Sequence, residues 1–456
     1  MKNRARLPPK LGDIDKGRSR RVGDPAYKGG GVASWCVCRP RNLMRRRLGC
    51  LSVWSLALVC FQGLATVRAA EPMIVEGPTG PVTIKEISAF KNFMKDVPPA
   101  TNNIGNAMVY GGSGEAAEAL GRVFEISGDV ELLNRMLVFT DRMLAGRNDP
   151  KTGAVIWTGA RELVWPNQAP KDGKPLYSST ENGDVIGHIA YAARLILENK
   201  KLWSDKVPGG DPFGFGATYR ERAATYVREM DRTLDTFILK WLVRPDTHRC
   251  YSPDSPLYES VARPGSANQP VPWNQQTMLL NGFQRLAECH HLLGDDAARA
   301  QRYNTIVKAA VDWFFEAVER YEAKGKLCYK WTYVFEKPLR HIEDTGHGGY
   351  DVAGLARAYV SGRYGLTAEQ MRPLANTVSC VLQQPGNKFM GRVDGTPGKH
   401  PPGGLGGSWI DLCEFQPELL PVFIAANQGR IKSSPGLVAN LLWAKHRLQL
   451  TQKKQP

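Results

Sequence analysis

The first group of residues with ionisable side chains that could take part in catalysis is Glu181, Asp184, His188 and Tyr191. Successive members are three, four and three positions apart, so they share one stripe of a helix. Histidine and tyrosine are proton-transfer groups, and a nearby glutamate can engage a substrate. The spacing favours His188 and Glu181 as catalytic candidates. The competing interpretation is that the ring residues pack in the core while the acids cap the helix.

A second stripe holds Glu343, His347 and Tyr350, spaced by four and three positions. Both stripes contain Gly-His-x-x-Tyr, at 187–191 and at 346–350. His347 also lies among three glycines, where backbone can approach a ligand closely. The pattern makes His347 and Tyr350 catalytic candidates and Glu343 a substrate-binding one.

Removing a proton beside a carboxylate requires that the carboxylate's charge be offset, because the enolate-like species is otherwise too high in energy. Amides at helix starts and arginines in connecting loops can supply that offset, and aromatic rings there can stack on sugars. The same rings could instead seal the loops against the fold. The binding candidates are Asn182, Asn274, Gln275, Gln276, Arg249, Arg263, Tyr251 and Trp409.

These residues need helices to position them, and apolar spacing predicts helix after helix from Ser113 onward. Hairpins are expected at 113–144, 181–242, 273–323, 347–384 and 409–451. The first helix of several pairs opens with polar, aromatic or glycine residues. We therefore expect these first helices to line a ring, with their N-terminal ends on one face. The helix dipoles would favour an anion at that face. The predicted fold is an all-α (α/α) toroid of five to seven hairpins. Its long loops, 147–180, 244–272 and 385–408, would build a cleft.

Composition excludes several classes of protein. The 456 residues carry 60 Lys and Arg and 44 Asp and Glu, but residues 1–70 hold 15 basic and only 3 acidic side chains. The remaining 45 basic and 41 acidic residues nearly balance, so no nucleic-acid partner is expected. Phosphate-loop, dinucleotide and HExxH motifs are absent. We therefore expect neither a cofactor nor a metal.

The basic leader predicts export. Three arginines at 45–47 precede an apolar run from Leu48 to Val67, which is typical of a signal peptide over 44–70 with cleavage near Ala69. Residues 1–43 are interpreted as an over-long gene start or a disordered leader, and 71–456 as one catalytic domain. The protein is then secreted or periplasmic, with no stable membrane span in the mature chain. Its five mature cysteines lack zinc spacing and are expected to be mostly small buried residues.

An exported (α/α) barrel with Glu181–Asp184 leading to His188, Trp273–Gln276 and Glu343–Tyr350 resembles polysaccharide lyase family 38. Members of that family cleave glucuronan or alginate by β-elimination. The resemblance implies a tyrosine and a histidine that handle protons, with an arginine and a glutamate nearby. His188 and Glu181 match most naturally, whereas Tyr258, Tyr251 and Tyr350 all remain candidates for the tyrosine. The implied partner is an acidic polysaccharide.

Two alternatives stay open. A glycoside hydrolase on the same barrel would need two carboxylates about 5 to 9.5 Å apart. The sequence offers these carboxylates for the hydrolase: Asp184, Glu343, Asp344, Asp411 and Glu414. The second alternative is a helical scaffold that binds glycans without turnover and would need no acid–base pair.

Overall fold

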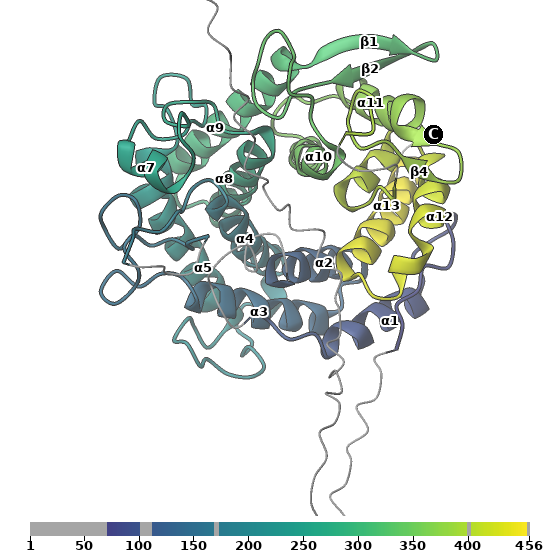
Figure 1. The fold of residues 1–456 in the computed structure, drawn as a ribbon. Helices are drawn as coiled ribbons and strands as arrows, with labels where there is room; N and C mark the ends of the chain where they lie inside the picture. Colours follow the sequence, from purple (N-terminus) through teal and green to yellow (C-terminus); the bar gives the residue numbers. More distant parts are fainter. Residues whose placement is uncertain (1–70, 101–111, 168–172, 399–402, 454–456) are drawn as a thin grey trace, which may run out of the picture. The chain divides into compact units, whose positions relative to one another are not determined.

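Six helical segments form a closed ring (Figure 1). Each contacts the next, and the last, α13, contacts the first, α2, so the ring closes. The structure is a computed structural model that describes residues 71–100, 112–167, 173–398 and 403–453, all in one compact unit. The predicted leader and signal peptide lie outside these residues. The ring consists of α2 (Gly112–Ser127), α4 (Asn182–Glu198), α8 (Trp273–Leu293), α10 (Thr345–Ser361), the 3-10 helix η4 (Gly407–Glu414) and α13 (Pro435–Lys453).

A second set of helices packs against this ring. α3 contacts α2 and α4, α5 contacts α4, α9 contacts α8, and α12 contacts η4 and α13. The all-α (α/α) toroid is therefore confirmed. The outer helices are α1 (Ile84–Lys95), α3 (Val130–Ala145), α5 (Tyr219–Thr233), α9 (Ala297–Ala317), α11 (Ala368–Asn376) and α12 (Leu419–Ile431).

Short elements complete the described chain. Single π turns extend α5 and α11, and two small antiparallel sheets, β1–β2 and β3–β4, lie in connections. Their bounds are η1 (Lys200–Leu202), η2 (Leu234–Ile238), α6 (Leu239–Trp241), α7 (Pro256–Val261), β1 (Glu319–Ala323), β2 (Lys326–Lys330), η3 (Thr377–Leu382), β3 (Gln383–Gln384) and β4 (Lys388–Phe389).

Two predicted boundaries were wrong. The helix expected to run to 323 ends at Ala317, because the backbone becomes extended at Val318 and continues as β1. Lys324 and Gly325, both with positive φ, then form the turn of the β1–β2 hairpin. The helix expected over 409–428 is broken into η4 and α12. In this last pair the second helix, α13, closes the ring, whereas it was expected to cover it.

Helix ends follow local chemistry. Thr83, Thr218 and Thr367 form capping boxes with Glu86, Glu221 and Gln370, which satisfy otherwise unpaired backbone N–H groups. The Gly-His-x-x-Tyr glycine of α4 instead permits close helix packing, because a Cβ on Gly187 would lie 2.3 Å from the Asn281 side chain of α8. A larger residue there would force the two ring helices apart.

Aliphatic and aromatic side chains fill the space between the two helical layers. As expected, most of these cysteines are buried: Cys250, Cys289, Cys328 and Cys413 are buried and Cys380 is half-buried. All five are free thiols. None of the helices in the described ranges combines the length and apolarity that a membrane crossing requires.

Candidate functional site

The ring helices begin at a common end. At the start of α4, Thr180 donates a hydrogen bond to Gln275 in the first turn of α8 (3.0 Å). Trp409 of η4 donates to the carbonyl oxygen of Thr345, the first residue of α10 (2.8 Å). The first turn of α13 packs in the same way against Glu115 in the first turn of α2. The N-terminal ends therefore converge, and their dipoles favour an anion there.

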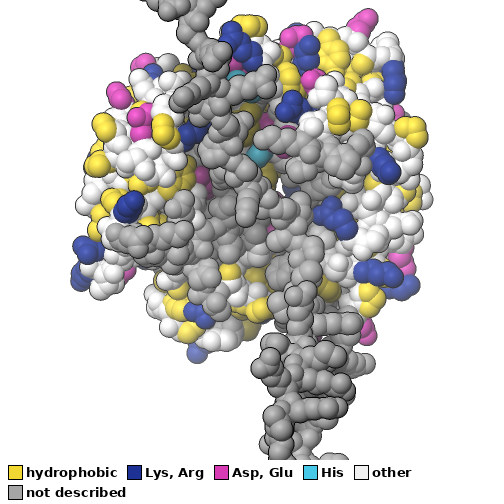
Figure 2. Space-filling model, in the orientation of Figure 1, with side chains coloured by type: hydrophobic (Ala, Val, Ile, Leu, Met, Phe, Trp, Pro, Cys, Tyr) yellow, Lys and Arg dark blue, Asp and Glu magenta, His cyan; other side chains and the backbone are white. Residues whose placement is uncertain are grey.

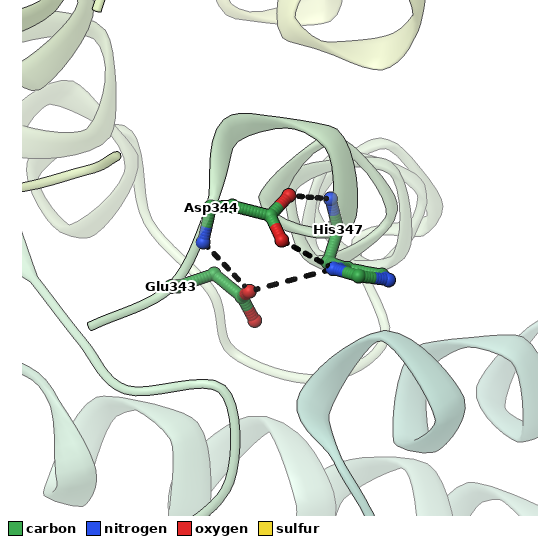
Figure 3. Close-up of side chains that lie close together, drawn as sticks. All are labelled: Glu343, Asp344 and His347. Carbon is green, nitrogen blue, oxygen red and sulfur yellow. Dashed lines mark hydrogen bonds and ion pairs between the residues drawn. The ribbon is translucent and has the colours of Figure 1, made fainter. Parts of the chain in front are cut away.

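An Asp–His pair stands at this end of α10 (Figure 3). Asp344 is the N-cap residue and accepts hydrogen bonds from the backbone N–H groups of Gly346 (2.8 Å) and His347 (2.9 Å). Its other carboxylate oxygen lies 2.7 Å from His347 Nδ1. This hydrogen bond raises the pKa of His347. The His347 side chain is 42% exposed, so its ring is held in place yet accessible.

Replacing Asp344 with Asn is expected to lower the pKa of His347, because the charged acceptor is removed while Asn caps a helix as well as Asp. The ring titration of His347, followed by NMR in both proteins, measures the shift. An unchanged titration would show that Asp344 does not control this imidazole.

A buried carboxyl pair lies beneath the Asp–His pair. Glu343 and Asp351 are both fully buried, and Trp331 Nε1 donates to Asp351 (2.8 Å). Burial, followed by the charge of Asp351, raises the pKa of Glu343 well above its usual range. Burial also raises the pKa of Asp351 to about 7. The pair therefore holds a proton near neutral pH, as two adjacent carboxyls in an apolar site do.

Tyr350 follows His347 by one helical turn and is 37% exposed. Its pKa is raised by burial and then by the charges of Asp184 on α4 and Glu115 on α2. Three ring helices thus present polar groups to one another at this end. The pKa of Glu115 is itself raised, chiefly by burial.

Of the Glu181 stripe, Asp184 acts on Tyr350, whereas Glu181 itself bonds to Tyr177 and Asn167. Glu181 is 3% exposed, and burial raises its pKa. Beside it, the hydroxyl of Tyr258 lies 3.5 Å from that of Tyr177 and 3.4 Å from Ser179 Oγ. This cluster joins loop 147–180 to loop 244–272. Tyr258 is nearly buried, so the cluster's visible role is to fix those loops.

His188 lies deeper inside the ring and is 6% exposed. Its Nδ1 is 3.4 Å from Glu118 Oε2, and Arg285 binds the same carboxylate at 2.8 Å. Asn182 is fully buried and donates to Ser178 and Ser179, while its oxygen accepts the N–H of Trp165 (2.7 Å). Both side chains are therefore held by buried polar partners.

Two of the loop residues predicted to bind substrate contact Trp313. Arg249 covers the Trp313 ring (4.7 Å) and pairs with Glu316 (2.9 Å), and Tyr251 stacks on the same ring at 5.7 Å. Arg263 is exposed on its loop.

The amide candidates of α8 lie near its start. Asn274 is nearly buried, and its Oδ1 has no partner within the described chain. Gln275 is half-buried and bonds to Thr180. Gln276 is buried and donates to the carbonyl oxygen of Cys250 (3.3 Å). Trp409 is buried under α10, where a Cβ on Gly348 would lie 3.1 Å from its ring. Of these residues, Gln275 is the most accessible polar group.

Two residues of this site were not predicted from the sequence. Asp351 stands four positions after His347 and so continues the stripe that was recognised. Glu115 is an acidic residue in the first turn of α2. Its position at the start of a ring helix is the feature of the sequence that could have identified it.

Glu343, Asp344 and His347 also each offer one donor atom, all within 4.8 Å of one another. Mixed carboxylate and imidazole donors suit a divalent cation. However, His347 Nδ1 and Asp344 already bind each other at 2.7 Å.

No protein-family model and no curated protein matches the sequence. Solved structures with similar folds include a family 76 glycoside hydrolase (mannosidase) from Bacteroides thetaiotaomicron, with 10% identity, a TM-score of 0.40, and coverage of 74% of this chain and 70% of that one. A polysaccharide lyase has 10% identity, a TM-score of 0.36, and coverage of 75% and 91%. A family 88 glycosyl hydrolase from Bacteroides vulgatus has 10% identity, a TM-score of 0.33, and coverage of 74% and 91%. Similarity this low does not bear on the substrate or the reaction.

Proposed function

We propose that this chain is a polysaccharide lyase that cleaves a uronate-containing polymer, glucuronan or alginate, by β-elimination at the N-terminal end of the ring. The observation that carries the proposal is the Asp344–His347 hydrogen bond with Tyr350 one turn away. These groups form a base and an acid on one accessible helix stripe, which is what the reaction requires.

The roles follow from the geometry. With Nδ1–H donated to Asp344, neutral His347 keeps its Nε2 lone pair free to accept the C5 proton of a uronate. The electron pair left on C5 forms the C4=C5 double bond as the C4–O4 bond breaks. Tyr350 is protonated at neutral pH, as an ordinary tyrosine is, and its raised pKa keeps it so, so it carries a proton to give to the departing O4. The partial positive charges at the converging helix N-termini stabilise the negative charge of the uronate carboxylate.

The distribution of charge is compatible with an acidic polymer. Figure 2 shows Lys and Arg side chains scattered among acidic and apolar ones over the visible face. A few donors focused at one site suffice for an anion, and a strongly basic surface is not needed.

Three of the five carboxylates that the sequence offers for a hydrolase are either bound to an arginine or fully buried. Asp411 is bound by Arg122 (2.6 Å) and Glu414 by Arg447 (2.6 Å). Glu343 is fully buried. A hydrolase needs one protonated and one ionised carboxyl group facing the sugar, and these three do not supply them.

One observation favours a hydrolase as the second candidate. Glu115, whose pKa is raised, and Asp184 both act on the pKa of Tyr350. A protonated Glu115 would be the general acid and Asp184 the base of an (α/α)-barrel glycoside hydrolase.

Incubation of the purified chain with glucuronan and with alginate distinguishes the two reactions. The lyase forms an unsaturated product whose ultraviolet absorbance grows with time. New reducing ends without that absorbance would select the hydrolase. Saturable binding of polymer without either signal would indicate a scaffold and would overturn both enzymatic proposals.

A further inference from the structure

A separate pocket lies toward the other end of the ring. Its volume is about 280 Å³, and its lining comes from the later turns of the ring segments α2, α4, α8, α10, η4 and α13. Small-molecule sites range from about 300 to 1,000 Å³, so this pocket suits a small ligand. Neither His347 nor Tyr350 lines it.

Every acidic side chain of the pocket wall already has an arginine partner, although Arg194 serves three of them. Each lies within 4.0 Å of an arginine nitrogen, as in the pair of Arg285 with Glu118 at 2.8 Å. Glu118 shows the effect: burial opposes ionisation, but Arg285 and the neighbouring cations hold its pKa well below the usual range. The pairs are Glu118 with Arg122 and Arg285, Asp411 with Arg122, Glu125, Glu198 and Glu288 with Arg194, and Glu414 with Arg447.

Arg357 is the exception in the inner wall. In the described part of the chain it has no ion-pair partner, and its Nε is buried without a hydrogen-bond acceptor. Burial and then the charge of Arg285 lower its pKa. Glu118 and Asp184 partly offset its charge, but a buried N–H without an acceptor costs free energy, and an anionic ligand would supply that acceptor.

A second unsatisfied group adjoins it. Gln284 donates its Nε2–H to the carbonyl oxygen of Arg357 (3.0 Å), whereas its Oε1 is buried without a donor. A ligand that satisfies both residues needs an anionic group for Arg357 and a hydroxyl for Gln284. The negative end of a helix dipole disfavours an anion, but this effect is confined to the last turn. Arg357 lies four residues before the end of α10, so the dipole does little to weaken an anion bound there.

We infer that this pocket binds a small hydroxylated carboxylate, with Arg357 holding the carboxylate and Gln284 a hydroxyl. A uronate monosaccharide has this chemistry, and its selection as the ligand rests on the proposed function. The pocket would then hold an acidic sugar apart from the place where the polymer is cut.

Calorimetric titration of the full chain with sodium glucuronate tests the inference, with sodium sulfate and glucose as comparison ligands. The wild-type chain is expected to bind glucuronate saturably and glucose not at all. Arg357→Met should weaken glucuronate binding by at least about tenfold. Gln284→Leu should weaken glucuronate binding but leave sulfate binding unchanged. Arg372→Met, an exposed arginine on α11, should bind as the wild type does.

Thermal unfolding gives an independent readout. Without ligand, Arg357→Met should melt at a higher temperature than the wild type, because a buried N–H group without an acceptor is removed. His347→Asn should still bind glucuronate in this pocket even though cleavage is lost, so failure of the lyase proposal and failure of this one remain distinguishable.

Three results would overturn the inference. These are equal glucuronate affinity in wild type and Arg357→Met, binding of sulfate but not glucuronate, and loss of glucuronate binding in His347→Asn. The last result would place the sugar at the N-terminal end.

Discussion

Replacing His347 with Asn is expected to lower kcat for uronan cleavage by about 10²- to 10⁴-fold, the range typical for loss of a general base. The physical reason is that Asn has no basic nitrogen with which to accept the C5 proton. Because the His347 side chain is 42% exposed, the change should scarcely affect stability. Initial rates from the ultraviolet absorbance of the product measure the effect.

His341→Asn is the matched control, since His341 also pairs with a carboxylate, Glu336 (3.0 Å), but is 78% exposed on a loop. It should retain the wild-type rate. The dependence of rate on pH adds a second check. The base is active when deprotonated, so Asp344→Asn should move the acidic limb of the profile to lower pH. A His347→Asn enzyme with unchanged kcat would assign the base elsewhere.

Replacing Lys445 with Met is expected to destabilise the protein by about 3–5 kcal/mol, the cost of leaving one member of a buried ion pair unpaired. Lys445 Nζ lies 2.7 Å from Glu86 Oε1, and the two side chains are 1% and 0% exposed. Glu86 also completes the capping box of α1. The pair therefore fastens the ring-closing helix α13 to α1. Denaturant unfolding followed by circular dichroism measures the loss.

Lys432→Met, at an exposed position after α12, is the control and should change stability by less than about 0.5 kcal/mol. Equal stability of the Lys445 variant and the wild type would show that α13 is held by apolar packing alone. Adding Glu86→Gln to Lys445→Met should recover part of the loss, because the stranded charge is then removed.

The ring could be predicted from the sequence because its helices carry continuous apolar stripes with clear breaks. Gly128-Asp129 separates α2 from α3 as expected, and the polar starts of α4, α8 and α10 do meet at one end. Which of the last three helical segments, η4, α12 and α13, belong to the ring could not be predicted. Which of two amphipathic helices closes a ring depends on long-range contacts such as those between α13 and α2, and spacing along the chain does not encode these contacts.

The site was predicted in part, for a related reason. Helical spacing correctly places His347 and Tyr350 on one exposed stripe but puts His188 and Tyr191 on an equally good one. Only the packing of α4 against its neighbours shows that the second stripe is buried, with Tyr191 bonded to Glu125. The loop candidates Arg249 and Tyr251 both contact the Trp313 ring, a contact that the sequence did not indicate. Loop direction is not encoded in residue type.

The most direct test of the central proposal is a crystal structure of the Tyr350→Phe variant with a bound oligouronate. We predict a uronate whose C5 lies within reach of His347 Nε2, whose O4 points toward residue 350, and whose carboxylate faces the N-terminal ends of the ring helices. An oligosaccharide bound instead between loops 147–180 and 244–272, against Tyr258 and away from His347, would contradict the proposal.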